Sequence, residues 1–202
     1  EILVEAISEA VKMTGGESLD DPELVDVVTN LVEIPYVAVG SFDSSFLEIP
    51  DEVLITSMRE HQKYFSVIDK NDGKLLPHFV VVSNMQATDM AVVAKGNERV
   101  LRARLEDAKF FFNTDCEIKL EARVEALSKV LFQAKLGSML NKVERIEALC
   151  GWFGTQLDYV ENEQADIMRA ARLCKADLVS GMVVEFPKLQ GIMGRVYALN
   201  DC

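Results

Sequence analysis

The spacing of apolar residues along the first third of the chain predicts two helices. Between residues 1 and 13, apolar side chains recur three and four positions apart, and the Gly15-Gly16 pair predicts the end of this helix. A second helix is predicted to begin at Pro22, with Asp20 or Asp21 as its N-cap. Its apolar residues form a broad face, as is typical of a helix that packs on a core.

After Pro35 the apolar pattern becomes that of β-strands. We predict a strand at 36–40, a brief helix from 49 to about 60, and two strands at 63–68 and 75–83. The Asn71-Asp72-Gly73 run between the last two strands predicts a hairpin turn. Because proline cannot donate a ladder hydrogen bond, Pro77 should lie at a sheet edge or at a bulge.

Beyond Gly96 the strand signals cease and the apolar spacing is helical almost to the end of the chain. A long helix is predicted from about residue 98 to 113. The predicted fold class is α+β, in which a mixed helix and strand domain over residues 1–115 precedes an all-α domain over residues 116–202. This last domain is expected to be truncated.

Composition excludes several classes of protein. The chain has 202 residues, of which 49% are hydrophobic and 27% charged, as in an ordinary globular protein. Its 33 acidic and 21 basic residues give a formal net charge of -12, so a polyanion would need a local basic patch. Without a long apolar run or a secretion signal, we expect no membrane contact and a cytoplasmic location.

The ends and the cysteines of the chain support two further expectations. The sequence starts at Glu1 without an initiator Met, so we expect an excised piece of a longer protein. The four cysteines are far apart and form no CxxC pair. We expect free thiols, buried or half-buried, in a reducing compartment: Cys116, Cys150, Cys174 and Cys202.

The predicted long helix is the best candidate for a phosphate-binding strip. Between residues 95 and 109, five basic residues meet three acidic ones, a local excess in a strongly acidic chain. The alternative is that ordinary surface ion pairs, Glu98 with Arg102 and Arg104 with Asp107, use these charges. The cations of the strip are Arg99, Arg102, Arg104 and Lys109.

A second basic stripe is predicted near the C-terminus. Arg169, Arg172 and Lys175 stand at i, i+3 and i+6, a spacing that places them on one side of a helix. The sequence does not rank this stripe against the first one. Both sets of residues are therefore candidates for contacts with a nucleic-acid backbone.

The sequence contains few residues suited to catalysis or to metal binding. His61 and His78 are the chain's histidines, and neither has a Ser or Cys nucleophile beside it in the sequence. Two histidines this far apart form no HxxxH motif, and the acidic residues show no calcium-loop spacing. We expect structural or exposed histidines, no catalytic residue and no metal site.

Glycines and aromatic residues in the second half favour structural roles. Gly191 and Gly194 lack a preceding strand and a phosphate-loop motif, so close helix packing is the expected use. Trp152 and the aromatic run at 110–112 are predicted to be core anchors, with base stacking as the weaker alternative.

Several segments between residues 59 and 194, read in order, resemble one family. They are REHQKYF at 59–65, DGKLLPHF at 72–79, GNERVLRARL at 96–105, DAKFF at 107–111, VLFQ at 130–133, LGS at 136–138, KADL at 175–178 and EFPKLQGIMG at 185–194. Together they resemble the β subunit of the bacterial-type heterotetrameric glycyl-tRNA synthetase. No single segment is decisive, but their joint occurrence is highly specific.

The resemblance implies an internal part of a ligase that charges tRNA with glycine at the expense of ATP. In this family the α subunit activates glycine with ATP and Mg, and the β subunit chiefly holds tRNA. The implied partners are the α subunit, glycine tRNA and the remainder of the β subunit. This part would hold no cofactor of its own and would lack the C-terminal anticodon-binding domain.

The helical half also resembles a degenerate member of the HD superfamily, whose intact members bind a divalent metal through histidines and aspartates. Asp177 falls at the aspartate of the His-Asp pair, while Ala176 stands in place of the histidine. Lys142 falls in place of another ligand. The resemblance therefore implies a lost metal site, with Asp177 as a vestige.

Three hypotheses follow from these observations. The leading one is a non-catalytic, tRNA-handling part of glycyl-tRNA synthetase that uses the two basic stripes. The second is an interaction scaffold with little RNA contact, which the net charge of -12 favours. The third is an HD-type phosphohydrolase that retains a metal through unusual ligands, among them Asp177.

Overall fold

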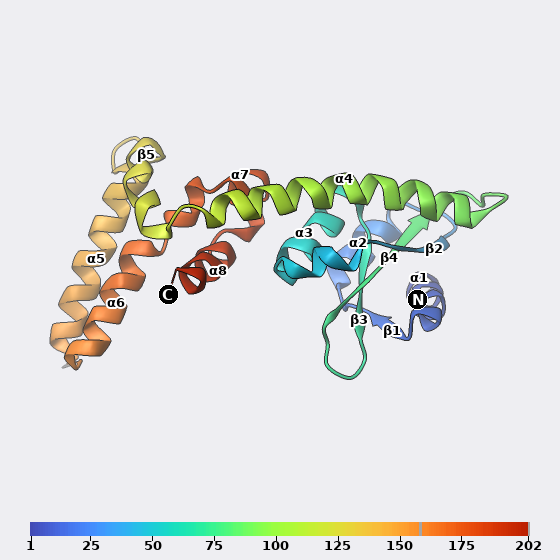
Figure 1. The fold of residues 1–202 in the computed structure, drawn as a ribbon, viewed down its shortest axis with the longest axis horizontal. Helices are drawn as coiled ribbons and strands as arrows, with labels where there is room; N and C mark the ends of the chain where they lie inside the picture. Colours follow the sequence, from blue (N-terminus) through green and yellow to red (C-terminus); the bar gives the residue numbers. More distant parts are fainter. Residues whose placement is uncertain (158, 202) are drawn as a thin grey trace. The chain divides into compact units, whose positions relative to one another are not determined.

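A computed structural model of the protein describes residues 1–157 and 159–201. The chain forms two compact units that divide between Lys109 and Phe110, inside one long helix (Figure 1). This division falls six residues before the domain boundary expected from the sequence. Each unit is described by itself below.

The first unit is a mixed α and β structure, which confirms the predicted fold class. Its four-stranded antiparallel sheet has the strand order β1-β3-β4-β2. Its elements are α1 (Ile2–Val11), β1 (Gly16–Ser18), α2 (Pro22–Thr29), β2 (Tyr36–Ser41), η2 (Ser44–Glu48), α3 (Asp51–Gln62), β3 (Phe65–Asp69), β4 (Leu75–Ser83) and most of α4 (Met90–Cys116).

Side chains close in the sequence determine where α2 begins. Asp21 resolves the choice between two candidate caps, because its Oδ1 accepts a hydrogen bond from the Leu24 amide at 2.9 Å. Pro22 occupies the first position of α2, as predicted. Arg59 of α3 donates to the carboxylates of Asp21 and Glu23, which connects α3 to the start of α2.

The predicted hairpin is formed by β3 and β4. The register between them shifts opposite the segment that contains Pro77, so this proline lies at a bulge. β4 is an interior strand, flanked by β3 and β2, and not a sheet edge. Gly73 closes the turn with a φ of 71°, a conformation that favours glycine.

Alternate residues of β4 pack on opposite faces of the sheet. Val80 joins the core formed with α1 and α2, while Phe79 points the other way and stacks on Tyr64 with ring centroids 4.7 Å apart. Gly40 lies opposite Phe79 in the register, and a Cβ at Gly40 would overlap that ring. The first core cluster contains Leu3, Ile7, Val11, Leu24, Val28, Phe65, Val67 and Val80.

The second unit is mainly helical. After the end of α4 it contains η3 (Leu120–Lys129), β5 (Leu131–Gln133), β6 (Gly137–Ser138), α5 (Met139–Gln156), α6 (Glu161–Leu173), η4 (Ala176–Val179), α7 (Gly181–Glu185), η5 (Pro187–Leu189) and α8 (Ile192–Asn200). The short antiparallel β5–β6 pair corrects the prediction of an all-α second half. These strands escaped prediction because runs of two and three residues show no periodicity.

A buried carboxylate organises the helical unit. Asp115, at the end of α4, accepts hydrogen bonds from the amides of Gly181 and Met182 at 2.9 and 2.8 Å. It also accepts from the Tyr197 hydroxyl at 2.9 Å and from the Arg123 guanidinium at 3.0 Å. One charge therefore holds the start of α7, α8 and η3 to the last turn of α4.

Three predictions about individual side chains were wrong. Trp152 is 57% exposed and Phe110 is 66% exposed, so neither is a core anchor among the described residues. Phe111 and Phe112 are half-buried. Cys174 is an exposed thiol, whereas Cys116 and Cys150 are half-buried, and all three are free. Cys202 lies outside the described residues.

No helix in the described part of the chain is long and apolar enough to cross a membrane. The longest, α4, carries charged residues throughout its length.

Candidate nucleic-acid interface

A cleft of about 570 Å³ lies beside the first half of α4 in the first unit. Three cations of α4 line one wall, and the end of β2 with the residues after it lines the other. We call this site the α4 cleft, and its residues are Ser41, Phe42, Asp43, Lys95, Glu98, Arg99 and Arg102.

The cations at 95, 99 and 102 share the cleft because a helix turns once in 3.6 residues, so these positions fall on one face. The same helix buries Leu101 and Leu105 completely. Packing of these leucines fixes the rotation of α4 about its axis. The local sequence therefore directs the basic face into the cleft once the core has formed.

The wall opposite the cations is joined to α4 by Glu98. Its Oε1 accepts hydrogen bonds from the Ser41 amide at 2.8 Å and from the Ser41 hydroxyl at 3.1 Å. The i,i+4 ion pair expected between Glu98 and Arg102 is absent from the described ion pairs. The sequence could not reveal this, because Ser41 is 57 positions away.

The guanidinium groups of the cleft keep their hydrogen-bond donors available. Within the described ranges, Lys95, Arg99 and Arg102 form no ion pair with a carboxylate. Arg99 and Arg102 are exposed. Unpaired cations at a concave surface attract phosphate groups, which Arg binds through paired N–H donors.

Asp43 is the acidic residue on the opposite wall. Its carboxylate accepts a hydrogen bond from the Ser45 amide at 2.8 Å, and this contact, followed by contact with the Ser45 hydroxyl, holds the pKa of Asp43 below its ordinary value. The positive charges of Arg102 and Lys109 contribute in the same direction. Asp43 stays ionised, so it opposes anion binding at its own edge of the cleft.

The other two cations of the first stripe lie outside the α4 cleft. Lys109 donates to the Ser45 carbonyl at 3.2 Å and to the Glu48 carboxylate at 3.1 Å, and it lies over the Phe46 ring. The positive charge of Lys109 is thus largely offset by contacts within the first unit. Arg104 is exposed on α4 without an ion pair to Asp107 among the described residues.

The second basic stripe does not form as a continuous helix face. α6 ends at Leu173, so Lys175 lies beyond the helix that carries Arg169 and Arg172. Arg172 forms ion pairs with Glu121 at 3.0 Å and Glu147 at 3.5 Å. Its positive charge is therefore offset locally.

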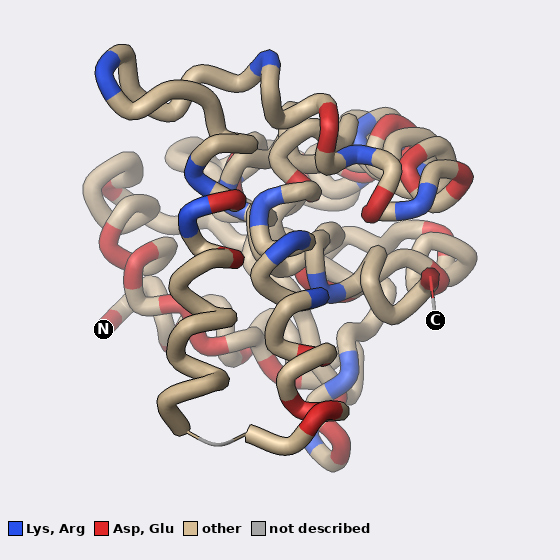
Figure 2. The backbone as a smooth tube through the Cα atoms, turned by 90° about the vertical axis from the view of Figure 1, so that its left-hand side faces the viewer, with Lys and Arg blue, Asp and Glu red and all other residues tan. Residues whose placement is uncertain are grey.

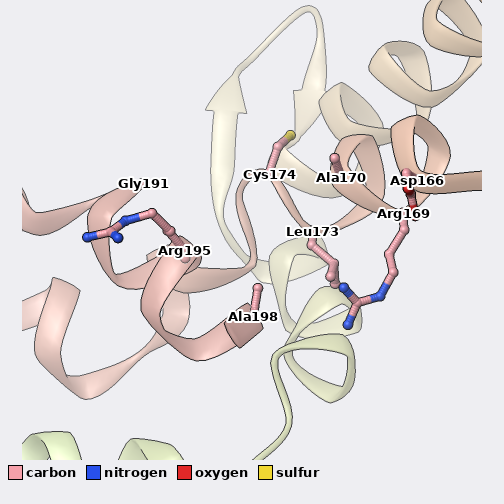
Figure 3. A pocket seen from close by; sticks show the side chains of 9 residues that line it. Asp166, Arg169, Ala170, Leu173, Cys174, Gly191, Arg195 and Ala198 are labelled. Carbon is pink, nitrogen blue, oxygen red and sulfur yellow. The ribbon is translucent and has the colours of Figure 1, made fainter. Parts of the chain in front are cut away.

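Arg169 lines a separate pocket of about 390 Å³ in the helical unit. Figure 3 shows its guanidinium beside the Leu173 side chain, while the Arg195 side chain extends away from it. The two arginines therefore do not converge on one position. Arg169 and Arg195 therefore do not form a phosphate clamp of two guanidinium groups.

Asp177 has a structural role that explains its burial. Its side chain is almost fully buried, and its Oδ2 accepts hydrogen bonds from the Gly191 amide and, at 3.0 Å, from the Gly194 amide. These amides lie at the start of α8. The helix N-terminus thus stabilises the buried carboxylate.

The described helical unit lacks the cluster of ligands that the metal site of an HD protein requires. No group of three or more His, Cys, Asp or Glu residues in the described part of the chain could hold a metal ion. Lys142, at another expected ligand position, lies 4.1 Å from the centroid of the Phe132 ring. Gly194 packs against Asp177, where a Cβ would approach its carboxyl carbon to 3.3 Å.

Sequence reasoning missed Asp115 and Arg123, the buried pair of the helical unit. Neither belongs to a recognisable motif, and no sequence pattern singled out either residue. Ser41 and Asp43 were also missed, because they reach α4 only through the fold. A weak signal existed for Asp43, which stands two residues before Ser45 as in a local Asx turn.

The fold and the α4 cleft define an α+β protein with a concave basic surface suited to an anionic partner. Comparison with known proteins gives the family. The family described as glycyl-tRNA synthetase beta subunit matches residues 1–202. The chain therefore belongs to this family, which confirms the resemblance drawn from the sequence.

Individual relatives agree with this assignment. The chain is 57% identical to the glycine–tRNA ligase beta subunit of Trichlorobacter lovleyi over 94% of its length and 27% of that protein. It is 55% identical to the beta subunit of Desulforapulum autotrophicum over 98% of its length and 28% of that protein. The chain thus spans less than a third of the length of these curated relatives.

Proposed function

We propose that this chain is a non-catalytic, tRNA-handling part of the β subunit of glycine–tRNA ligase, and that the α4 cleft contacts the phosphate backbone of glycine tRNA. The observation that carries the proposal is the group of unpaired cations Lys95, Arg99 and Arg102 at a concave surface of an otherwise acidic chain. Family membership supports tRNA as the polyanion.

The proposed contacts position tRNA and do not read its sequence, because guanidinium and ammonium groups at a backbone carry no base information. The amino-acid activation step, with its ATP and Mg, is assigned to the α subunit. This chain contributes no cofactor-binding or catalytic side chain. Its proposed partners are glycine tRNA, the α subunit and the remainder of the β subunit, in a cytoplasmic heterotetramer.

Charge reversal at the cleft tests this proposal. The double variant Arg99→Glu/Arg102→Glu, in the assembled α and β subunits, should weaken glycine tRNA binding by at least about tenfold. The slope of log affinity against log salt concentration should fall by about 2, since two phosphate contacts are lost. In aminoacylation assays the KM for tRNA should rise while kcat changes little.

Arg104→Glu is the matched control, because Arg104 is exposed on the same helix but does not line the cleft. It should leave tRNA affinity and the salt slope nearly unchanged. If general charge and not the cleft governed binding, Arg104→Glu, which reverses one charge, would lose about half as much log affinity as the double variant, which reverses two.

The net charge of -12 favours a second candidate, a scaffold that binds the α subunit and contacts RNA little. In that case, Arg99→Glu/Arg102→Glu would leave tRNA affinity intact. Substitutions at exposed apolar positions would instead weaken the association of α with β, as measured by analytical ultracentrifugation.

A further inference from the structure

The far end of the α5–α6 hairpin carries a cluster of apolar side chains that the described residues leave exposed. Exposed fractions in this cluster run from 42% to 63%, although large apolar side chains favour burial. We call this cluster the hairpin tip, and its residues are Leu149, Trp152, Phe153, Leu157, Tyr159 and Val160.

Three residues of the hairpin tip share one face of α5, and the other three follow in the connection to α6. Leu149, Trp152 and Phe153 are three and four positions apart, so they are neighbours on α5. The rings of Trp152 and Phe153 meet edge to face, with centroids 5.0 Å apart. Gly154, by contrast, is buried against Gln164 of α6. α5 therefore packs on α6 with one side and presents the tip on another.

The charges around the tip disfavour a nucleic acid. Between residues 146 and 168 the sequence has five acidic residues and no Lys or Arg. In Figure 2 the end of α5 beside the grey trace is uncharged, and acidic residues mark the start of α6. A phosphate backbone would be repelled here, so Trp152 is not placed to stack on RNA bases. An apolar protein surface with basic residues at its rim would be complementary.

The greater length of the relatives indicates which part of the protein could supply an apolar surface complementary to the hairpin tip. In those reported above, the matched segment is 27% to 28% of a longer polypeptide. A covalently attached segment is present at a high effective concentration, which favours its binding to an apolar face over that of a separate molecule. Contiguous apolar patches on a folded protein commonly mark such contact surfaces.

We propose that the hairpin tip is an intramolecular docking surface, covered in the intact β subunit by an apolar segment of the same polypeptide outside residues 1–202. The proposal rests on family membership and not on tRNA contact at the α4 cleft. Aromatic anchors such as Trp152 and Phe153 would supply much of the binding energy of this contact.

Photocrosslinking of the intact β subunit tests the proposal. Trp152 is replaced by photoreactive benzoylphenylalanine, and the purified subunit is irradiated without α subunit or tRNA. Mass spectrometry should find a crosslink to the same polypeptide, outside the segment that corresponds to residues 1–202. A crosslink between two β copies, a crosslink that appears only after α subunit or tRNA is added, or the absence of any crosslink would overturn it.

Stability of the intact β subunit gives a second, independent measurement. Trp152→Asp should lower the midpoint of thermal unfolding by several degrees, and the milder Trp152→Ala, which is more certain to fold, by a smaller amount. Val184→Asp is the matched control, since Val184 is 71% exposed and lies outside the tip. If the Trp152 variants change the midpoint no more than Val184→Asp, the tip is uncovered and the proposal fails.

Discussion

Asp115 and Asp177 are the two buried carboxylates of the described residues, and each accepts hydrogen bonds from backbone amides at the start of a helix. Asp115 has Arg123 as a charged partner, whereas Asp177 depends on the amides of α8. A buried charge is tolerated only where such donors surround it. At the residue scale, the helical unit is thus organised by carboxylates that hold helix ends.

Removal of the Asp177 carboxylate should destabilise the helical unit. Asp177→Ala leaves the amides of Gly191 and Gly194 without their acceptor, so we expect a loss of about 2–4 kcal/mol in the free energy of unfolding. Asp177→Asn keeps one acceptor oxygen and should cost about 1 kcal/mol. Urea denaturation monitored by circular dichroism measures both. Equal losses from the two variants would contradict the capping role.

The raised pKa of Tyr64 predicts that the protein loses stability at alkaline pH. Burial raises the pKa of its phenol from 10.0 to about 12, and its hydroxyl donates to Asn97 Oδ1 at 2.6 Å. The unfolded chain releases this proton at a lower pH than the folded one. The stabilisation is therefore complete below about pH 10 and lost as pH rises towards 12.

Thermal unfolding as a function of pH checks this expectation. Tyr64→Phe has no proton to lose, so its stability should fall less steeply between pH 10 and 12. Burial also raises the pKa of Tyr197, which should retain a share of the alkaline loss in the variant. A pH dependence identical to that of the parent protein would exclude Tyr64 as a source.

At the element scale, the pairing of β2 with β4 depends on a glycine. Gly40 lies opposite Phe79, whose ring fills the space that a side chain at Gly40 would need. The ring in turn stacks on Tyr64, which follows α3. Because Gly40 has no Cβ, β2 can pair with β4 while the Phe79 ring stays stacked on Tyr64 at the end of α3.

Gly40→Ala should destabilise the sheet by about 1–3 kcal/mol, because the new methyl group displaces the Phe79 ring. Phe79→Leu should relieve the overlap, so the double variant should lose less than the sum of the single losses. Gly96→Ala is the contrasting substitution: Gly96 lies in α4 with open space around its Cα, so alanine should stabilise by up to about 1 kcal/mol. Chemical denaturation compares all four variants, and additive losses would refute the overlap.

At the scale of the whole molecule, two cores share one helix. The first unit is built on the sheet and the second on the Asp115 network, and α4 contributes buried residues to both. The net charge of the whole chain, -12, is also unevenly distributed. Unpaired cations lie at the α4 cleft, and a run of acidic residues lies at the α5–α6 hairpin. Separate regions of one acidic chain thus suit different partners.

Phe110→Pro tests whether each core holds its own unit together. Proline at this position removes a hydrogen bond of α4 and breaks the helix locally, at a cost of about 3 kcal/mol. Hydrogen exchange should increase in the neighbouring turns of α4, while the amides of β3, β4 and α5 keep their protection. Phe110→Ala, which preserves the helix, is the control. Loss of protection throughout either unit would show that its core depends on the intact helix.

The sequence by itself determined the α+β class, the helix that begins at Pro22, the β3–β4 hairpin and the family. These features depend on local periodicity, turn residues and short motifs, which neighbouring residues specify. It also indicated a basic face on α4. It misjudged Trp152, because an aromatic residue at helical spacing is consistent with a core and with an exposed contact face alike.

Only the tertiary structure decided which charges remain available. Glu98 contacts Ser41 and not Arg102, Arg172 is paired with Glu121 and Glu147, and Asp177 caps α8. These partners are separated by 14 to 57 positions in the sequence. Long-range contacts follow from how elements pack in space, and the spacing of residues along one helix does not specify them.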